Sequence, residues 1–129
     1  MLVESPSLLI TDDDRDFRET LQVGLEPRGF KTILAGDGEE ALEIVRTREV
    51  HLVLLDMHMP KLTGLETLRL LKQFRAMLPC ILLSAQLDEL LIEQARLAQA
   101  FSVLAKPITL GRLTGILRQA LERTYDWHG

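Results

Sequence analysis

The sequence predicts an α/β protein with a doubly wound, open parallel sheet of five strands. Five short apolar runs alternate with five segments of helical periodicity along the 129 residues. That alternation is typical of parallel sheets covered by helices on both faces. One run, residues 50–55, is apolar at nearly every position, as expected for a central strand buried on both sides. The length fits a single domain over residues 1–129, with a core of about residues 6–124.

The expected strands are short apolar runs that cover residues 8–11, 30–35, 50–55, 79–84 and 101–105. The expected helices repeat apolar side chains every three or four residues, and they lie within residues 12–29, 36–49, 63–77, 87–100 and 109–126. Pro27 and Gly29 should end the first helix, and Gly24 weakens its pattern. Residues 125–129 are expected to form a fraying tail or the start of a longer segment.

Composition excludes several classes of protein. The chain is 47% hydrophobic and 26% charged, with a net charge of −4, which argues against nonspecific nucleic-acid binding. The single cysteine, Cys80, excludes an internal disulfide, and its apolar neighbours favour a buried, unreactive thiol. No apolar run reaches the roughly 18 residues of a membrane span, and the N-terminus lacks signal-peptide features. A cytoplasmic protein without membrane contact is therefore expected.

Polar side chains stand where the predicted strands end. Asp12 and Asp13 follow the first strand, Asp56 follows the third, Ser84 ends the fourth and Lys106 follows the fifth. The carboxyl ends of parallel strands share one edge of the sheet, and ligands bind there. We therefore expect these five side chains to form a site.

Three converging acids require a cation. Two carboxylates about 4 Å apart repel by roughly 4 kcal/mol at an effective dielectric near 20. Carboxylate and carbonyl oxygens suit Mg²⁺, and Lys106 can offset further charge. A carboxylate beside Mg²⁺ and a lysine can also act as a nucleophile toward phosphorus. Each residue alone has a simpler explanation; Asp13 or Asp14, for example, could only cap the following helix. The occurrence of such residues at the end of several strands together favours a binding site.

Four motifs carry a family resemblance: "LLITDDD", "LVLLDMHMPKLTG", "ILLSA" and "LAKPI". Over about residues 6–124 the chain resembles the receiver domain of two-component response regulators, in the CheY-like superfamily. The resemblance implies a flavodoxin-like (βα)5 fold with strand order 2-1-3-4-5. It also implies a signalling phosphoacceptor rather than an enzyme, with Mg²⁺-dependent self-phosphorylation and autodephosphorylation at most.

The resemblance implies a role for each acid. Asp56 looks like the phosphoacceptor, which forms an aspartyl phosphate and also contacts the metal. Asp13 looks like the direct Mg²⁺ ligand and Asp12 its partner, mostly through water, while Asp14 leads into the first helix. The backbone carbonyl of His58 looks like the third protein ligand.

The phosphoryl group is expected to contact two further residues. Ser84 stands where the family has Thr or Ser, followed by the small Ala85, and Lys106 is similar to the family's phosphate-binding lysine. The bond between Lys106 and Pro107 is commonly cis in the family, and only X–Pro bonds adopt cis cheaply.

The first departure from the family is Val103, which replaces the usual aromatic residue three positions before the lysine. Phe101 is nearby and is expected to point to the same side of the sheet as Val103. The usual aromatic switch coupled to Ser84 is therefore in question.

Three further positions are unusual. Gln99 replaces the glycine that commonly ends the fourth helix, where a left-handed non-glycine residue would be strained. His58 and Gln86 flank the attacking water in the family, so they are expected to tune dephosphorylation. His51 at the start of the third strand is expected to be a hydrogen-bonded edge histidine.

The resemblance implies a histidine kinase or phosphotransfer protein as donor, and a downstream effector domain or protein, which could belong to the same full-length chain. Leu90 and Leu97 are surplus to the inward stripe of the fourth helix. They are candidates for an output surface or for a homodimer through the fourth helix, fifth strand and fifth helix, although single exposed leucines are also common on protein surfaces. Two alternatives remain: a receiver-like interaction module with little or no phosphotransfer, and a flavin or nucleotide binder on the same fold. The latter lacks a glycine-rich phosphate loop.

Overall fold

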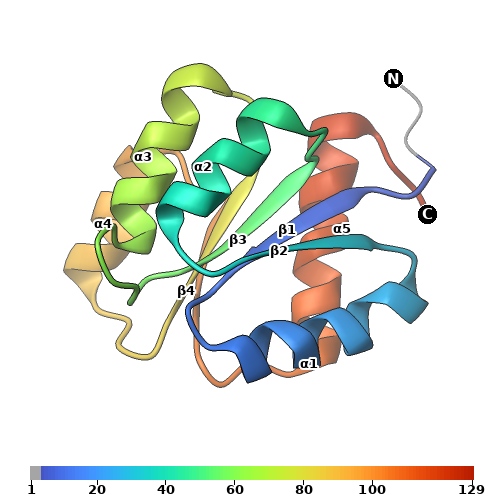
Figure 1. Ribbon diagram of the computed structural model, residues 1–129, viewed down its shortest axis with the longest axis horizontal. Helices are drawn as coiled ribbons and strands as arrows, with labels where there is room; N and C mark the ends of the chain where they lie inside the picture. The colour runs from blue at the N-terminus through green and yellow to red at the C-terminus, as the bar shows by residue number, and fades with distance from the viewer. Residues whose placement is uncertain (1–3) are drawn as a thin grey trace.

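A computed structural model describes residues 4–129, and its centre is a parallel sheet in the order β2-β1-β3-β4-β5 (Figure 1). The strands run over Ser7–Thr11 (β1), Lys31–Ala35 (β2), Leu52–Asp56 (β3), Cys80–Ser84 (β4) and Ser102–Ala105 (β5). All four neighbouring pairs are parallel. The predicted fold class and strand order are confirmed.

The helices span Arg15–Leu25 (α1), Gly38–Thr47 (α2), Gly64–Phe74 (α3), Glu89–Leu97 (α4) and Leu110–Tyr125 (α5), and a 3-10 turn follows α1 at Glu26–Arg28 (η1). Each α-helix begins after a polar side chain that accepts a hydrogen bond from the first turn; these caps are Asp14, Asp37, Thr63, Asp88 and Thr109. Among residues 4–129, no helix combines the length and apolar character needed to cross a bilayer.

The core has two halves, one on each face of the sheet (Figure 1). One half joins the sheet to apolar side chains of α2, α3 and α4, and the other joins it to those of α1 and α5. Every residue of β3 is buried, as predicted for a central strand. Gly24, the predicted weak point of α1, lies against α5, where a Cβ would be 2.7 Å from a methyl group of Leu110. The glycine therefore lets the two helices approach.

Two predicted local features are present. Cys80 is buried, and burial raises the pKa of its thiol to about 12, so the thiol is unreactive at neutral pH. Gln99 has a left-handed backbone with φ of 66° two residues after α4 ends, as the sequence predicted. This conformation costs a residue with a Cβ about 1–2 kcal/mol.

The expectation for Phe101 is wrong. Phe101 precedes β5 and packs with the α1 and α5 half of the core, whereas Val103 packs with the α2, α3 and α4 half. The two side chains therefore lie on opposite faces of the sheet. Strand alternation would put residues two apart on the same face, but Phe101 is still in the turn before the strand begins.

Of the two expectations for residues 125–129, the fraying tail is wrong. Tyr125 is the last residue of α5, and its hydroxyl donates a 2.8 Å hydrogen bond to the carbonyl of His51. Trp127 is only 8% exposed, and its ring lies 5.9 Å from that of Phe30. Apolar burial and this aromatic contact hold the segment in place.

Candidate functional site

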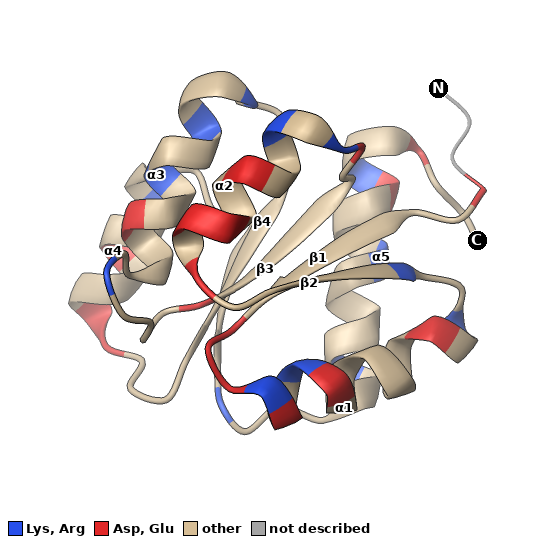
Figure 2. Cartoon of the chain, viewed as in Figure 1, with Lys and Arg blue, Asp and Glu red and all other residues tan. Residues whose placement is uncertain are grey.

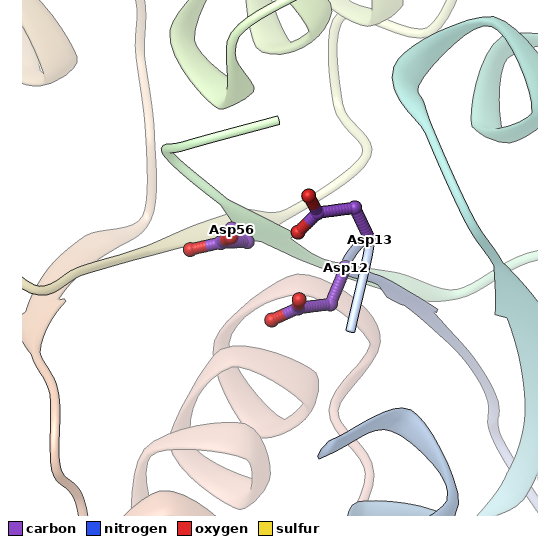
Figure 3. Close-up of side chains that lie close together, drawn as sticks. All are labelled: Asp12, Asp13 and Asp56. Atoms are coloured by element: carbon purple, nitrogen blue, oxygen red, sulfur yellow. The ribbon is translucent and has the colours of Figure 1, made fainter. Parts of the chain in front are cut away.

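Three carboxylates converge at the carboxyl end of the sheet (Figure 3). Asp12 and Asp13 follow β1, and Asp56 is the last residue of the neighbouring β3. One carboxylate oxygen from each lies within 4.8 Å of the others. Asp12 and Asp56 are 2% and 6% exposed, while Asp13 is exposed. The cluster has two buried charges and one at the solvent boundary.

Lys106 bridges the two buried acids. Its Nζ lies 3.0 Å from Asp12 Oδ2 and 3.0 Å from Asp56 Oδ1. The backbone N–H of Lys106 donates to the carbonyl of Ser84, which extends the β4–β5 pairing to the site. The ammonium also lies 4.3 Å from the ring centre of Phe17, so an aromatic face covers it from the α1 side.

The pKa values at the site follow from burial and these contacts. Burial raises the pKa of Asp12, and hydrogen bonds from the Asp14 N–H and from Lys106 only partly oppose this. Burial by itself would lower the pKa of Lys106, but its hydrogen bonds with Asp12 and Asp56 outweigh that effect and raise it. Lys106 therefore stays charged, and it neutralises only part of the charge of three carboxylates.

The loop after β1 holds its acids by backbone hydrogen bonds. Asp12 Oδ1 accepts from the Asp14 N–H at 2.9 Å, and Arg18 donates to the Asp12 carbonyl at 2.7 Å. Asp14 caps α1 through the N–H groups of Asp16 and Phe17. Asp14 thus belongs to the start of the helix, and the acid cluster contains Asp12 and Asp13 instead.

The loop after Asp56 is fixed by close backbone packing. The N–H of Met57 donates to the carbonyl of Leu83, and the N–H of Gly64 donates to the carbonyl of Met57. A Cβ on Gly64 would overlap the carbonyl of Asp56, so only glycine fits there. This tight return positions the chain around Asp56.

Ser84 and His58 form a second group beside the acids. Ser84 is fully buried, and its hydroxyl donates to the Gln86 carbonyl at 2.9 Å and accepts from the Gln86 N–H at 3.1 Å. His58 is exposed, with Nε2 3.5 Å from the same hydroxyl. The sequence predicted Ser84 as a phosphoryl contact, but in this conformation its hydroxyl is engaged by its own loop.

The charges of the cluster fit a small divalent cation. Three carboxylates and one ammonium leave an excess of negative charge, and Asp12 and Asp56 are buried. Hard carboxylate oxygens are ligands that Mg²⁺ prefers.

Residues 8–118 match the family model described as "Response regulator receiver domain". The chain belongs to this family. Similar curated proteins include response regulator MprA of Mycolicibacterium vanbaalenii, which is 39% identical over 118 residues, covering 91% of this chain and 51% of the relative. This receiver chain thus spans about half the length of the curated relatives it matches.

Solved receiver structures have the same fold. The signal receiver domain of an HD domain-containing protein from Pseudomonas fluorescens Pf-5 superposes with a TM-score of 0.89 at 31% identity, covering 95% of this chain and 99% of that one. A CheY-like receiver domain from Methanospirillum hungatei gives a TM-score of 0.91 at 21% identity, covering 95% and 98%, and supports the fold alone. Membership of the family places the chain in two-component signalling and replaces the flavin-binding alternative, and the acidic cluster is typical of the Mg²⁺ site of receiver domains.

Proposed function

We propose that Asp56 is the phosphoacceptor of this receiver domain. The observation that carries the proposal is the double contact of Lys106, which ties the buried carboxylates of Asp56 and Asp12 together next to Asp13. An ammonium beside the nucleophile can stabilise the charge that spreads over the oxygens of a transferring phosphoryl group. A carboxylate oxygen so placed can attack phosphorus directly and form a mixed anhydride.

The reaction would exchange one bond to phosphorus for another. An oxygen of Asp56 attacks the phosphorus of a phosphohistidine, the P–N bond breaks, and the imidazole of the donor leaves and takes up a proton. In the same proposal Asp12 and Asp13, with Asp56 and the His58 carbonyl, would hold Mg²⁺, which supplies positive charge for the phosphoryl oxygens. Lys106 then contacts a phosphoryl oxygen. Ser84 contacts another after it leaves its partner Gln86.

Partners follow from family membership. A histidine kinase or phosphotransfer protein supplies the phosphoryl group in the cytoplasm, where ATP is available. Phosphorylation shifts a two-state equilibrium that an effector domain or protein reads. The domain itself makes no nucleic-acid or membrane contact in this proposal.

A surface on α4 could carry the output. Leu90 and Leu97 are 67% and 66% exposed and lie two turns apart on the same stripe of the helix. We propose that they contribute to a homodimer or effector surface made by α4, β5 and α5. Leu90→Asp should abolish phosphorylation-dependent association measured by light scattering; unchanged association would refute this surface.

The test of the phosphoacceptor is intact-mass spectrometry after incubation with acetyl phosphate and Mg²⁺. We expect one phosphoryl adduct that needs Mg²⁺ and is absent from Asp56→Asn. An adduct that persists in this variant would refute the assignment of Asp56. Ser84→Ala should still form the adduct, but more slowly.

The second candidate is an interaction module with little phosphotransfer. It is favoured by Val103, which offers no ring for the usual coupling to Ser84, and by the hydroxyl of Ser84 being engaged with Gln86. A time course of acetyl phosphate treatment that never shows an adduct, even at its earliest points, would favour this candidate over the first.

A further inference from the structure

The end of the sheet opposite the acids has a groove, which we call the arginine groove. It consists of two adjoining hollows of about 400 and 300 Å³ that share Arg75 and Tyr125. Arg46 and Arg48 line the first hollow, and Met77 lines the second. The groove lies where α2, the α3–β4 connection and the end of α5 meet, and Lys and Arg gather at the ends of α2 and α3 there (Figure 2).

The three arginines of the groove have no acidic partner. Within residues 4–129, no carboxylate lies within 4.0 Å of the guanidinium nitrogens of Arg46, Arg48 or Arg75. The one acid that lines the groove, Glu49, lies 3.3 Å from Nε2 of His51. The groove therefore holds three cationic side chains against one carboxylate, and its net charge is positive.

Two of these guanidinium groups are held by contacts that leave their charge free. Arg75 donates to the carbonyl of Val45 in the last turn of α2 at 3.2 Å. The guanidinium of Arg46 lies 5.4 Å from the ring centre of Phe74. Both contacts restrict long side chains in advance, which lowers the entropy cost of binding an anionic group.

The second hollow adds an apolar surface. Met77 is 81% exposed and Phe74 is 40% exposed, and both lie beside the arginines. Helix dipoles favour cations at the C-terminal ends of α2 and α3, which explains Arg46 and Lys72. They do not explain an exposed methionine. Arginine, methionine and aromatic residues together are the types enriched in protein interfaces.

We propose that the arginine groove docks an acidic segment of a partner protein, with its carboxylates on Arg46, Arg48 and Arg75 and an apolar side chain against Met77. A nucleic acid fits less well, because Glu49 stands among only three cations and the chain carries a net charge of −4. The groove is at the amino ends of the strands, so this inference does not rest on the proposed phosphoacceptor.

The test is an NMR titration of ¹⁵N-labelled protein with a synthetic peptide, acetyl-Glu-Glu-Asp-Leu-Phe-Glu-Asp-amide. We expect amide shifts concentrated in residues 46–51 and 75–78 and at Tyr125. The affinity should fall at least about tenfold in Arg46→Glu/Arg48→Glu and about threefold in Met77→Ser. Arg112→Glu is the control for a charge reversal away from the groove and is compared with Arg46→Glu alone, because Arg112 is exposed near the other end of α5, about 20 Å away along the helix.

Four results would overturn the proposal. The first is no saturable binding of the peptide up to about 1 mM, and the second is equal affinity for a peptide with Gln and Asn in place of its acids. The third is a set of amide shifts centred on α4, and the fourth is a loss of affinity in Arg112→Glu equal to that in Arg46→Glu. A single-stranded DNA dodecamer that binds the same residues more tightly than the peptide would reassign the groove to nucleic acid. Acetyl phosphate should modify Arg46→Glu/Arg48→Glu as it does the parent, so a failure here is distinguishable from a failure of the proposed function.

Discussion

Neutralising Asp13 should stabilise the protein when Mg²⁺ is absent. Asp13 makes no side-chain hydrogen bond or ion pair within residues 4–129, and its carboxylate lies within 4.8 Å of those of Asp12 and Asp56. Asp13→Asn therefore removes repulsion and no attractive contact. It keeps the size and shape of the side chain, so packing is unchanged.

The magnitude follows from the separation of the carboxylates. Two unit charges 4.8 Å apart repel by about 0.9 kcal/mol at the dielectric constant of water, and by about 3.5 kcal/mol at an effective value near 20. Because Asp13 is exposed, the repulsion is close to the value for the dielectric constant of water, and dissolved salt weakens this repulsion further. Two neighbouring carboxylates repel Asp13 and the Lys106 ammonium beside them attracts it, so we expect the free energy of unfolding to rise by about 1 kcal/mol at low ionic strength.

Urea unfolding in EDTA at low salt measures this change. Trp127 provides the signal, since the only tryptophan of the chain is buried against Phe30 and becomes exposed on unfolding. Glu43→Gln is the matched control, because it removes one exposed negative charge from α2, away from the cluster. Adding Mg²⁺ should stabilise the parent more than Asp13→Asn, because a bound ion stabilises the folded state in proportion to its affinity.

Two results would refute this reasoning. One is an Asp13→Asn protein that is no more stable in EDTA than the parent. The other is a gain equal to that of Glu43→Gln, which would mean that overall charge, rather than the cluster, sets the effect.

Three further predictions concern single positions. Gln99→Gly should raise the free energy of unfolding by up to about 1 kcal/mol because it relieves a left-handed backbone, whereas Gln99→Ala should not; urea unfolding checks both. Gly64→Ala should lower stability and slow acetyl phosphate labelling, because its Cβ overlaps the Asp56 carbonyl; labelling at the parent rate would contradict this. Burial lowers the pKa of His51, whose Nδ1 accepts from the Ser7 N–H, so the folded state binds a proton less readily than the unfolded chain. Stability should therefore fall as the pH drops below about 6.5, by at most about 1.4 kcal/mol per pH unit, and His51→Asn should flatten this slope in urea unfolding at several pH values.

The fold and the position of the acids were predictable from local patterns. Strand and helix periodicities alternate clearly along the chain, and polar residues follow the predicted strands. In a parallel sheet these ends share one edge, so Asp12, Asp13 and Asp56 had to lie near one another. The left-handed backbone of Gln99 was also predictable, because chains commonly adopt this conformation where a helix ends.

The predictions for Phe101 and for the C-terminal segment were wrong because tertiary packing, rather than the local sequence pattern, decides where these side chains lie. Phe101 was placed by strand alternation, but β5 begins one residue later, so the ring enters the other half of the core. Trp127 was placed in a tail because short polar segments at chain ends often fray, yet Phe30, far away in the sequence, gives it an apolar contact.

The sequence by itself determined the parallel sheet, its helices and the edge at which the acids meet, because these follow from periodicity and chain direction. Only the tertiary structure decided that Lys106 reaches both Asp12 and Asp56, that the hydroxyl of Ser84 is engaged with Gln86, and that three arginines surround a groove at the far end. The reason is that these contacts join segments brought together by the order of strands and the packing of helices. Distances of about 3 Å between side chains depend on that packing, and no local pattern specifies it.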